Sequence, residues 1–250
     1  MLHGFAPSRR HSILMEQQQS LPISPLYPLH GDTLGIYGSC PDEIYSIIRD
    51  MHEITQIFMA HWNYIGGVYP TSSSAELASY DINMQQIYAR LLLRPASLDV
   101  LGTDWIYESC RLAALIYCRS IVQGVPLAES ADVMHARHSG AGNSGITTIQ
   151  ALHHALNNTD KSGHWGDMRG VFLWVCLVGG AGSWPSEQSV YGERDDGQQP
   201  SAWIRKTFSL YAVKCAMAIG AEHAGPVVEA QRTMLQVQSL INLKRGIASQ

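Results

Sequence analysis

The chain has 250 residues, 46% of them hydrophobic and 15% charged, a composition typical of a globular protein with a substantial core. Its 17 basic and 21 acidic residues give a formal net charge of −4, so it has no surplus of cations with which to hold a nucleic-acid backbone. We therefore predict a single folded domain that does not bind duplex DNA by itself.

Residues 1–35 mix Pro, Ser, Gln and His without helical or strand periodicity, which predicts a disordered tail or linker. The triple glutamine at residues 17–19 stands where a secretory signal would need its apolar segment. Residues 36–250 are predicted to form the folded part. Its first helix should begin after Ser39, where a proline and two acids suit a first helical turn, and should end at Gly66.

Further helices are predicted from apolar residues at three- and four-residue steps. They cover about residues 75–93, 104–123 and 147–156, and each is followed by proline, glycine or asparagine. The glycine-rich segment 136–145 and the polar segment 185–200 are predicted to be loops. No segment favours strands, so the expected fold class is all-α, a multi-helix, bundle-like domain.

The longest uninterrupted apolar run extends from Val171 to Val178 and includes Leu173 and Trp174. It is shorter than the roughly 18 apolar residues that cross a bilayer, so we predict a buried core helix. Trp165–Gly166 before the run and Gly179–Gly180 after it are interpreted as its boundaries. Another helix is predicted over residues 203–219, and a last one from Pro226 to about residue 243.

Five single cysteines cannot all pair within one chain, and most lie in apolar segments, a pattern typical of a reducing compartment. Cys110 and Cys118 are eight residues apart on similar faces of a predicted helix. We interpret them as packed and unreactive. The complete set is Cys40, Cys110, Cys118, Cys176 and Cys215.

Several residues could carry chemistry, but none has the spacing that a known site requires. Histidines cluster in one third of the chain without a Cys-x-x-Cys or His-Glu-x-x-His motif, so no metal site is predicted. Ser183 lacks the second glycine of a nucleophile elbow and a preceding strand to present it. The glycines of 179–182 lack the Lys-Ser/Thr of a phosphate loop. The histidines are His135, His138, His153, His154 and His164. We assign no catalytic, cofactor-binding, metal-binding or DNA-binding residue.

A ligand pocket lined by tryptophans stays open as a hypothesis, although large aromatic residues more often fill a core. The six are Trp62, Trp105, Trp165, Trp174, Trp184 and Trp203.

Two strings are distinctive: YESCRLAALIY from Tyr107 to Tyr117, and GVFLWVCLVGGA from Gly170 to Ala181. With Tyr37–Gly38 ahead of Asp42, they resemble the helical regulatory region of fungal-specific zinc-cluster transcription factors, over a span from about Leu34 to Ile241. The chain departs from that family at Met168–Arg169, where Leu-Pro is common. The resemblance implies an all-α, non-enzymatic regulatory domain in the nucleus.

The same resemblance implies what partners to expect. Family members read DNA with an amino-terminal cluster of cysteines that binds zinc, whereas the first cysteine here is Cys40. Zinc is therefore expected only in such a cluster and not in this chain. The expected partners are other transcription factors or co-regulators, a second copy of the chain, or a small inducer, with no membrane contact.

Two alternatives remain. The chain could be a helical small-molecule-binding protein or an enzyme, in which case His153, His164 and Trp174 should surround one cavity. It could instead be a truncated, DNA-binding-deficient fragment, because Met1 opens directly onto a linker-like segment. Translation of the genomic sequence before Met1 would then reveal paired cysteines.

Overall fold

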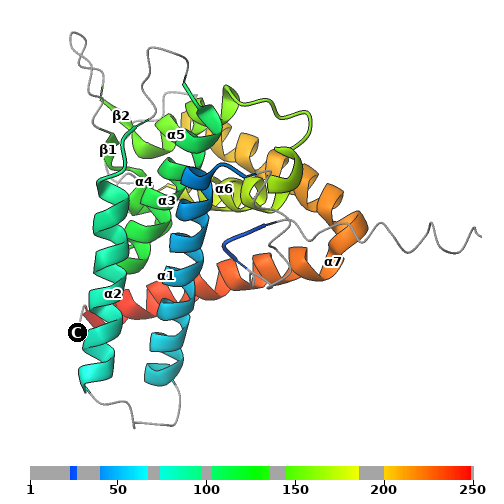
Figure 1. Cartoon of the computed structure of the whole chain (residues 1–250). Helices are drawn as coiled ribbons and strands as arrows, with labels where there is room; N and C mark the ends of the chain where they lie inside the picture. The colour runs from blue at the N-terminus through cyan, green and yellow to red at the C-terminus, as the bar shows by residue number, and fades with distance from the viewer. Residues whose placement is uncertain are drawn as a thin grey trace, which may run out of the picture.

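Seven α-helices make up nearly all the regular structure in the computed structural model, which describes residues 23–26, 40–66, 74–96, 103–135, 145–185 and 200–248. Figure 1 shows their arrangement. The helices are α1 (Asp42–Gly66), α2 (Ser74–Leu92), α3 (Trp105–Gln123), α4 (Leu127–Ala131), α5 (Thr148–Asn157), α6 (Arg169–Gly182) and α7 (Pro200–Ala248), with a short 3₁₀ helix, η2 (Gly166–Met168). The prediction of an all-α fold is confirmed.

Two very short strands, β1 (Met134–His135) and β2 (Ile146–Thr147), accompany the helices. They pair antiparallel, with Met134 opposite Thr147 and His135 opposite Ile146. The sequence predicted no strand here, because two residues are too few to show the alternation by which strands are recognised. Residues 136–144 of the predicted loop lie outside the described part of the chain, as do residues 186–199 of the second predicted loop.

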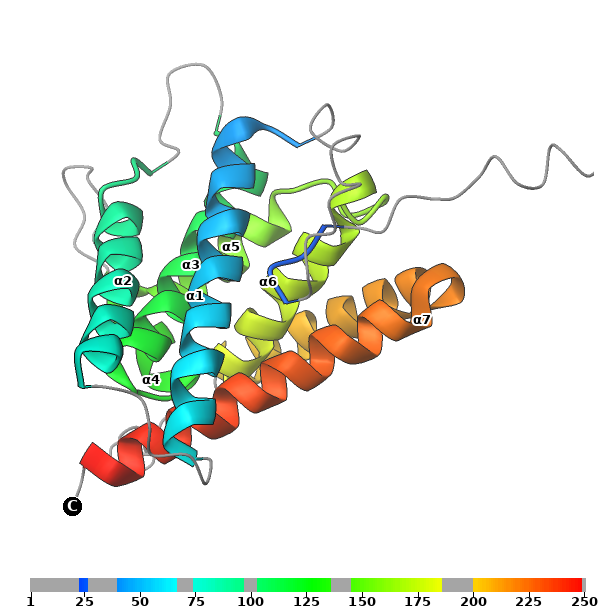
Figure 2. The ribbon, with the colours of Figure 1, turned by 60° about the horizontal axis from the view of Figure 1, so that its bottom comes forward.

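Helix α3 lies at the centre of the molecule, in contact with each of the other α-helices. Helices α1 and α2 run antiparallel along one side of it, while α5 and α6 cover another (Figures 1 and 2). Its position follows from its composition, since most of its side chains are buried and most of the buried ones are apolar. Two of its few charges, Glu108 and Arg111, neutralise each other through hydrogen bonds of 2.7 and 2.8 Å.

Both ends of α3 are closed by specific contacts. At the start, Asp104 Oδ1 accepts hydrogen bonds from the backbone N–H groups of Ile106 and Tyr107. At the end, Gly124 adopts the left-handed conformation with φ of 67°. Lys244 of α7 donates to the carbonyl oxygens of Ile121 and Val122 at 3.1 and 2.9 Å. This lysine satisfies orphan carbonyls and places a positive charge at the negative end of the helix dipole.

Helix α6 contains the apolar run and is buried as predicted, with Leu173 at 2% exposure and Trp174 fully enclosed. The interpretation of Gly179–Gly180 as the end of this helix is wrong, because α6 continues to Gly182. The reason lies in packing: a Cβ on Gly179 would stand 2.4 Å from the Phe208 ring of α7. Glycine is needed here for the close approach of α7, not for a turn.

Helix α7 consists of two arms that meet at His223, whose φ of −137° and ψ of 62° break the helical path. The first arm covers residues 200–222 and the second 224–248, with Pro226 in the first turn of the second, where a missing N–H does no harm. The predicted division into two helices is thus confirmed, although the second arm extends beyond residue 243. In Figure 2 the second arm crosses the lower end of α1.

One short segment departs from the predicted amino-terminal tail. Residues 23–26 are buried, with Ile23 and Leu26 in the main hydrophobic core. The Pro25 carbonyl oxygen lies 3.1 Å from Nδ1 of His52 on α1. The prediction of a linker is therefore wrong for these four residues. Burial of the apolar side chains of Ile23 and Leu26 is favourable and holds the segment against the core. Residues 1–22 and 27–39 lie outside the described part.

No helix in the described part of the chain has the length and apolar character needed to cross a membrane.

Candidate functional site

A cleft of about 410 Å³ opens where α4, the end of α6 and the second arm of α7 meet. This volume lies within the range of small-molecule sites, roughly 300–1,000 Å³. Leu127 and Ile241 contribute buried apolar surface, while Gln238 and Asn242 contribute amide groups. The cleft thus combines apolar walls with several hydrogen-bonding groups, the combination that holds and orients an organic ligand.

An ion pair closes one side of the cleft. Arg245 Nη1 lies 3.0 Å from Glu129 Oε1, and both side chains are partly accessible. A pair that solvent reaches contributes little stability, so both groups can rearrange toward a ligand at small cost.

The cleft is also lined by an aromatic residue, Trp184, just after the end of α6. Trp184 is 62% exposed, and its ring lies under the Arg205 guanidinium, which is 4.7 Å from the ring centroid. The prediction that the tryptophans fill the core is wrong for Trp184 and for Trp203, which is 64% exposed. An exposed indole held in place by a cation offers a flat face on which a planar group can stack.

Contacts between helices bring together the three segments that line the cleft, from α4, the end of α6 and the second arm of α7. A Cβ on Gly182 would stand 3.0 Å from the Cβ of Ala131, so the end of α6 lies directly against α4. On the α7 side, Lys244 is anchored to the end of α3 and thereby places its neighbour Arg245 opposite Glu129. The cleft is therefore positioned by the central helix.

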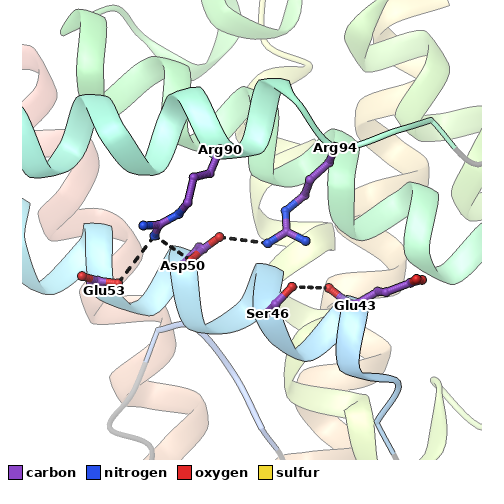
Figure 3. A network of polar contacts seen from close by, with 6 residues as sticks. All are labelled: Glu43, Ser46, Asp50, Glu53, Arg90 and Arg94. Atoms are coloured by element: carbon purple, nitrogen blue, oxygen red, sulfur yellow. Dashed lines mark hydrogen bonds and ion pairs between the residues drawn. The ribbon is translucent and has the colours of Figure 1, made fainter.

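A second polar cluster lies between α1 and α2 and is shown in Figure 3. The Asp50 carboxylate accepts hydrogen bonds from Arg90 and Arg94, both at 3.0 Å. Asp50 is 2% exposed, whereas Glu53, 4.0 Å from Arg90, is about half exposed. Each oxygen of Asp50 binds one guanidinium, so the cluster ties the two helices together. Nε of Arg94 is buried without a hydrogen-bond partner among the described residues, and none of these side chains lines the cleft.

The residues proposed to surround a catalytic cavity pack against different rings. The ring centroids are 6.0 Å apart for His153 and Phe208, and 5.5 Å apart for His164 and Phe172. Trp174 lies edge-on to Tyr117 in the core at 6.1 Å. None of the three lines the cleft. The two adjacent histidines of α5 differ in exposure, since His153 is partly buried and His154 is exposed.

Two consecutive residues, His164 and Trp165, have positive φ values of 48° and 65°. Such a conformation is strained for a large side chain and can mark a functional site. Here packing compensates for it, because both rings lie edge-on to Phe172, with Trp165 at 5.1 Å. Gly166 follows with φ of 59° and leads into η2, so the predicted boundary at Trp165–Gly166 is confirmed.

Ser183 and the cysteines have structural contacts. The Ser183 hydroxyl is buried and donates to the Gly180 carbonyl at 2.8 Å, which caps the end of α6. All five cysteines are free and buried. Burial raises the pKa of the Cys110 and Cys176 thiols well above the usual range and that of Cys215 to about 12. Within the described residues, no three His, Cys, Asp or Glu side chains are grouped to hold a metal ion.

No sequence pattern indicated the cleft, and only the open hypothesis of a tryptophan-lined pocket included one of its residues, Trp184. Its walls come from segments near residues 126–129, 181–185 and 238–245, which share no motif. The polar residues on the second arm of α7, such as the partly buried Gln238 and the exposed Asn242, also suit an ordinary solvated face, so they did not indicate a site.

Comparisons of the chain with protein-family models, with curated proteins and with solved structures find no match.

Proposed function

We propose that the chain is the regulatory domain of a transcription regulator of the fungal zinc-cluster type, acting in the nucleus through contacts with other transcription factors or co-regulators. The observation that carries the proposal is the resemblance of the strings 107–117 and 170–181 to that family's regulatory region. These strings lie on α3 and α6, which pack together with the Tyr117 and Trp174 rings at 84°. No catalytic step is part of this role.

A reporter assay tests the proposal. The chain would be fused to an unrelated DNA-binding domain in a fungal cell carrying a reporter with the matching operator. We expect the fusion to change transcription relative to the DNA-binding domain alone. Leu173→Asp, which destroys the core, should abolish the change, whereas Arg49→Glu, an exposed substitution on α1, should leave it intact. A folded fusion that leaves transcription unchanged would count against the role.

Direct DNA recognition is not part of this role, because the chain has a net charge of −4. In a gel shift at low salt the purified chain should show no sequence-selective complex. A selective complex that survives rising salt would contradict the proposal as stated.

The cleft supports a second candidate function, the binding of a small inducer. We propose a planar organic molecule that stacks on Trp184 and hydrogen-bonds to Gln238, Asn242 or the Glu129–Arg245 pair. A panel of heteroaromatic amides would be screened by thermal shift and equilibrium dialysis. A hit should quench Trp184 fluorescence and lose affinity in Trp184→Ala, but not in Trp203→Ala, an exposed tryptophan that does not line the cleft. Equal losses in both variants would exclude this site.

A further inference from the structure

The first arm of α7 carries an apolar stripe on the face turned away from the core. Four side chains form it, and they are between 49% and 72% exposed, namely Trp203, Leu210, Val213 and Met217. At 100° per residue they fall within an arc of roughly 80°. The arm's buried residues, including Ile204, Phe208 and Cys215, lie on the opposite side against α6.

The stripe is long enough to dock a helix. From Trp203 to Met217 it extends over about 21 Å, or roughly four helical turns, at 1.5 Å per residue. Its spacing of seven residues between Trp203, Leu210 and Met217 matches the repeat at which one helix packs along another. Several large apolar side chains exposed along one helix face mark an interaction site more often than an ordinary solvated face.

The charges beside the stripe are all positive. The first arm contains Arg205, Lys206 and Lys214 and a single acidic residue, Glu222, although the whole chain has a net charge of −4. Glu222 stands at the end of the arm, about 100° from Trp203 on the helical wheel and outside the stripe, and lies 3.9 Å from Arg169. On the helical wheel Lys206 lies within the stripe and Lys214 at its edge. Both lysines are exposed, and neither has an ion-pair partner in the described part of the chain. The face is thus complementary to an acidic partner.

The two lysines argue against a second copy of the chain or a membrane as the binding partner of this face. If two copies of the face paired antiparallel about Leu210, Lys206 of each copy would meet Lys214 of the other, and parallel pairing would place like lysines side by side. Like charges directly opposed are unfavourable in both arrangements. A membrane is also a poor fit, since lipid-binding segments carry clusters of roughly four to eight cations.

We propose that this face, defined by Trp203, Lys206, Leu210, Lys214 and Met217, binds an acidic amphipathic helix from a partner protein. The partner's apolar residues would pack at seven-residue spacing on the stripe, and its carboxylates would pair with the two lysines. The inference rests on α7 alone and holds whether or not the chain regulates transcription.

The test uses the full chain and a synthetic, fluorescein-labelled peptide with leucines at helical spacing and glutamates flanking them. We expect saturable binding by fluorescence anisotropy that weakens with added salt. Met217→Ser and the double variant Lys206→Glu/Lys214→Glu should each weaken binding by about tenfold or more. Matched controls, Ile82→Ser and Arg49→Glu, change exposed residues on α2 and α1 and should leave affinity unchanged.

Charge exchange makes the test specific. A peptide with lysine in place of every glutamate should not bind the natural chain but should bind the Lys206→Glu/Lys214→Glu variant, because the complementarity is then reversed. The proposal is overturned if the acidic peptide and a scrambled peptide bind equally or neither binds. It is overturned as well if Leu210→Ser abolishes a dimer detected by sedimentation, or if anionic phospholipid vesicles bind the chain while the peptide does not.

Discussion

Leu173 lies in the interior of α6 with 2% of its surface exposed, so its replacement by alanine should leave a cavity. We expect Leu173→Ala to lower the free energy of unfolding by about 2–5 kcal/mol, measured by urea denaturation. Leu210→Ala provides the control, because this leucine is 49% exposed and its truncation should change stability by less than about 0.5 kcal/mol. Equal effects at the two positions would contradict the assignment of α6 to the core.

The five buried thiols should be unreactive in the folded protein. Burial raises the pKa of Cys40 to about 11 and that of Cys215 to about 12, so almost no thiolate, the reactive form, exists near pH 8. Ellman's reagent should therefore detect no thiol natively and five after denaturation. The variant Ser209→Cys, at an exposed position of α7, should add one thiol that reacts at once. Rapid native reaction of the unmodified chain would show that its helices open readily.

At the scale of helix pairs, two neighbouring glycines of α6 should respond in opposite ways to alanine. A Cβ at Gly179 would stand 2.4 Å from the Phe208 ring, whereas one at Gly180 would stand 3.9 Å from the nearest Phe208 atom. Gly179→Ala must push α7 away and should destabilise by about 1–3 kcal/mol. Gly180→Ala should be neutral or stabilise by up to about 1 kcal/mol, because alanine favours the helix. Thermal unfolding of both variants would measure these changes in stability. A loss of stability at both positions would contradict the explanation by the Phe208 contact and would indicate that α6 needs flexible residues here.

A buried carboxylate, Asp50, contributes to the contact between α1 and α2. Asp50→Ala leaves Arg94, which is 20% exposed, without its partner and should destabilise by about 1–3 kcal/mol. Glu53→Ala removes a carboxylate beside the same Arg90, but this one is 52% exposed and 4.0 Å away, so its loss should change stability by less than about 0.5 kcal/mol. Urea denaturation would measure both. A small effect of Asp50→Ala would mean that water readily replaces the carboxylate.

At the scale of the whole molecule, three helices meet around His61, a residue of α1 that packs against Tyr80 of α2. Burial lowers its pKa, an effect that Lys244 of α7 reinforces and Asp81 of α2 opposes. The unfolded chain therefore binds a proton more readily than the folded one. The stability that His61 contributes is complete above its unfolded pKa of 6.5 and is lost as pH falls through the lower folded value.

Urea denaturation from pH 8 to pH 5 would measure this effect. Wild-type stability should fall below pH 6.5, and the fall should be shallower in His61→Phe, which has no group to protonate. Part of the slope should persist, because burial also lowers the pKa of His153. Parallel curves for the two proteins would show that folding does not change the pKa of His61.

Most of the helices followed from the sequence by itself. Periodic apolar residues indicate where a helix lies, and local signals mark its ends within a few residues. For α3, Asp104 marks the start and Gly124 the end. The burial of the Val171–Val178 run followed from its lack of polar residues. These properties depend on neighbours along the chain, which the sequence displays directly.

Only the tertiary structure decided the role of Gly179, the burial of Ile23 and Leu26, the cleft beside Trp184 and the exposed stripe on α7. Each depends on which distant segment lies opposite. Gly179 continues its helix because Phe208 needs the space, and Trp203 is exposed because α6 covers the other side of α7. The same local pattern suits a core or a binding surface, and the difference arises when the helices pack and one face is left uncovered.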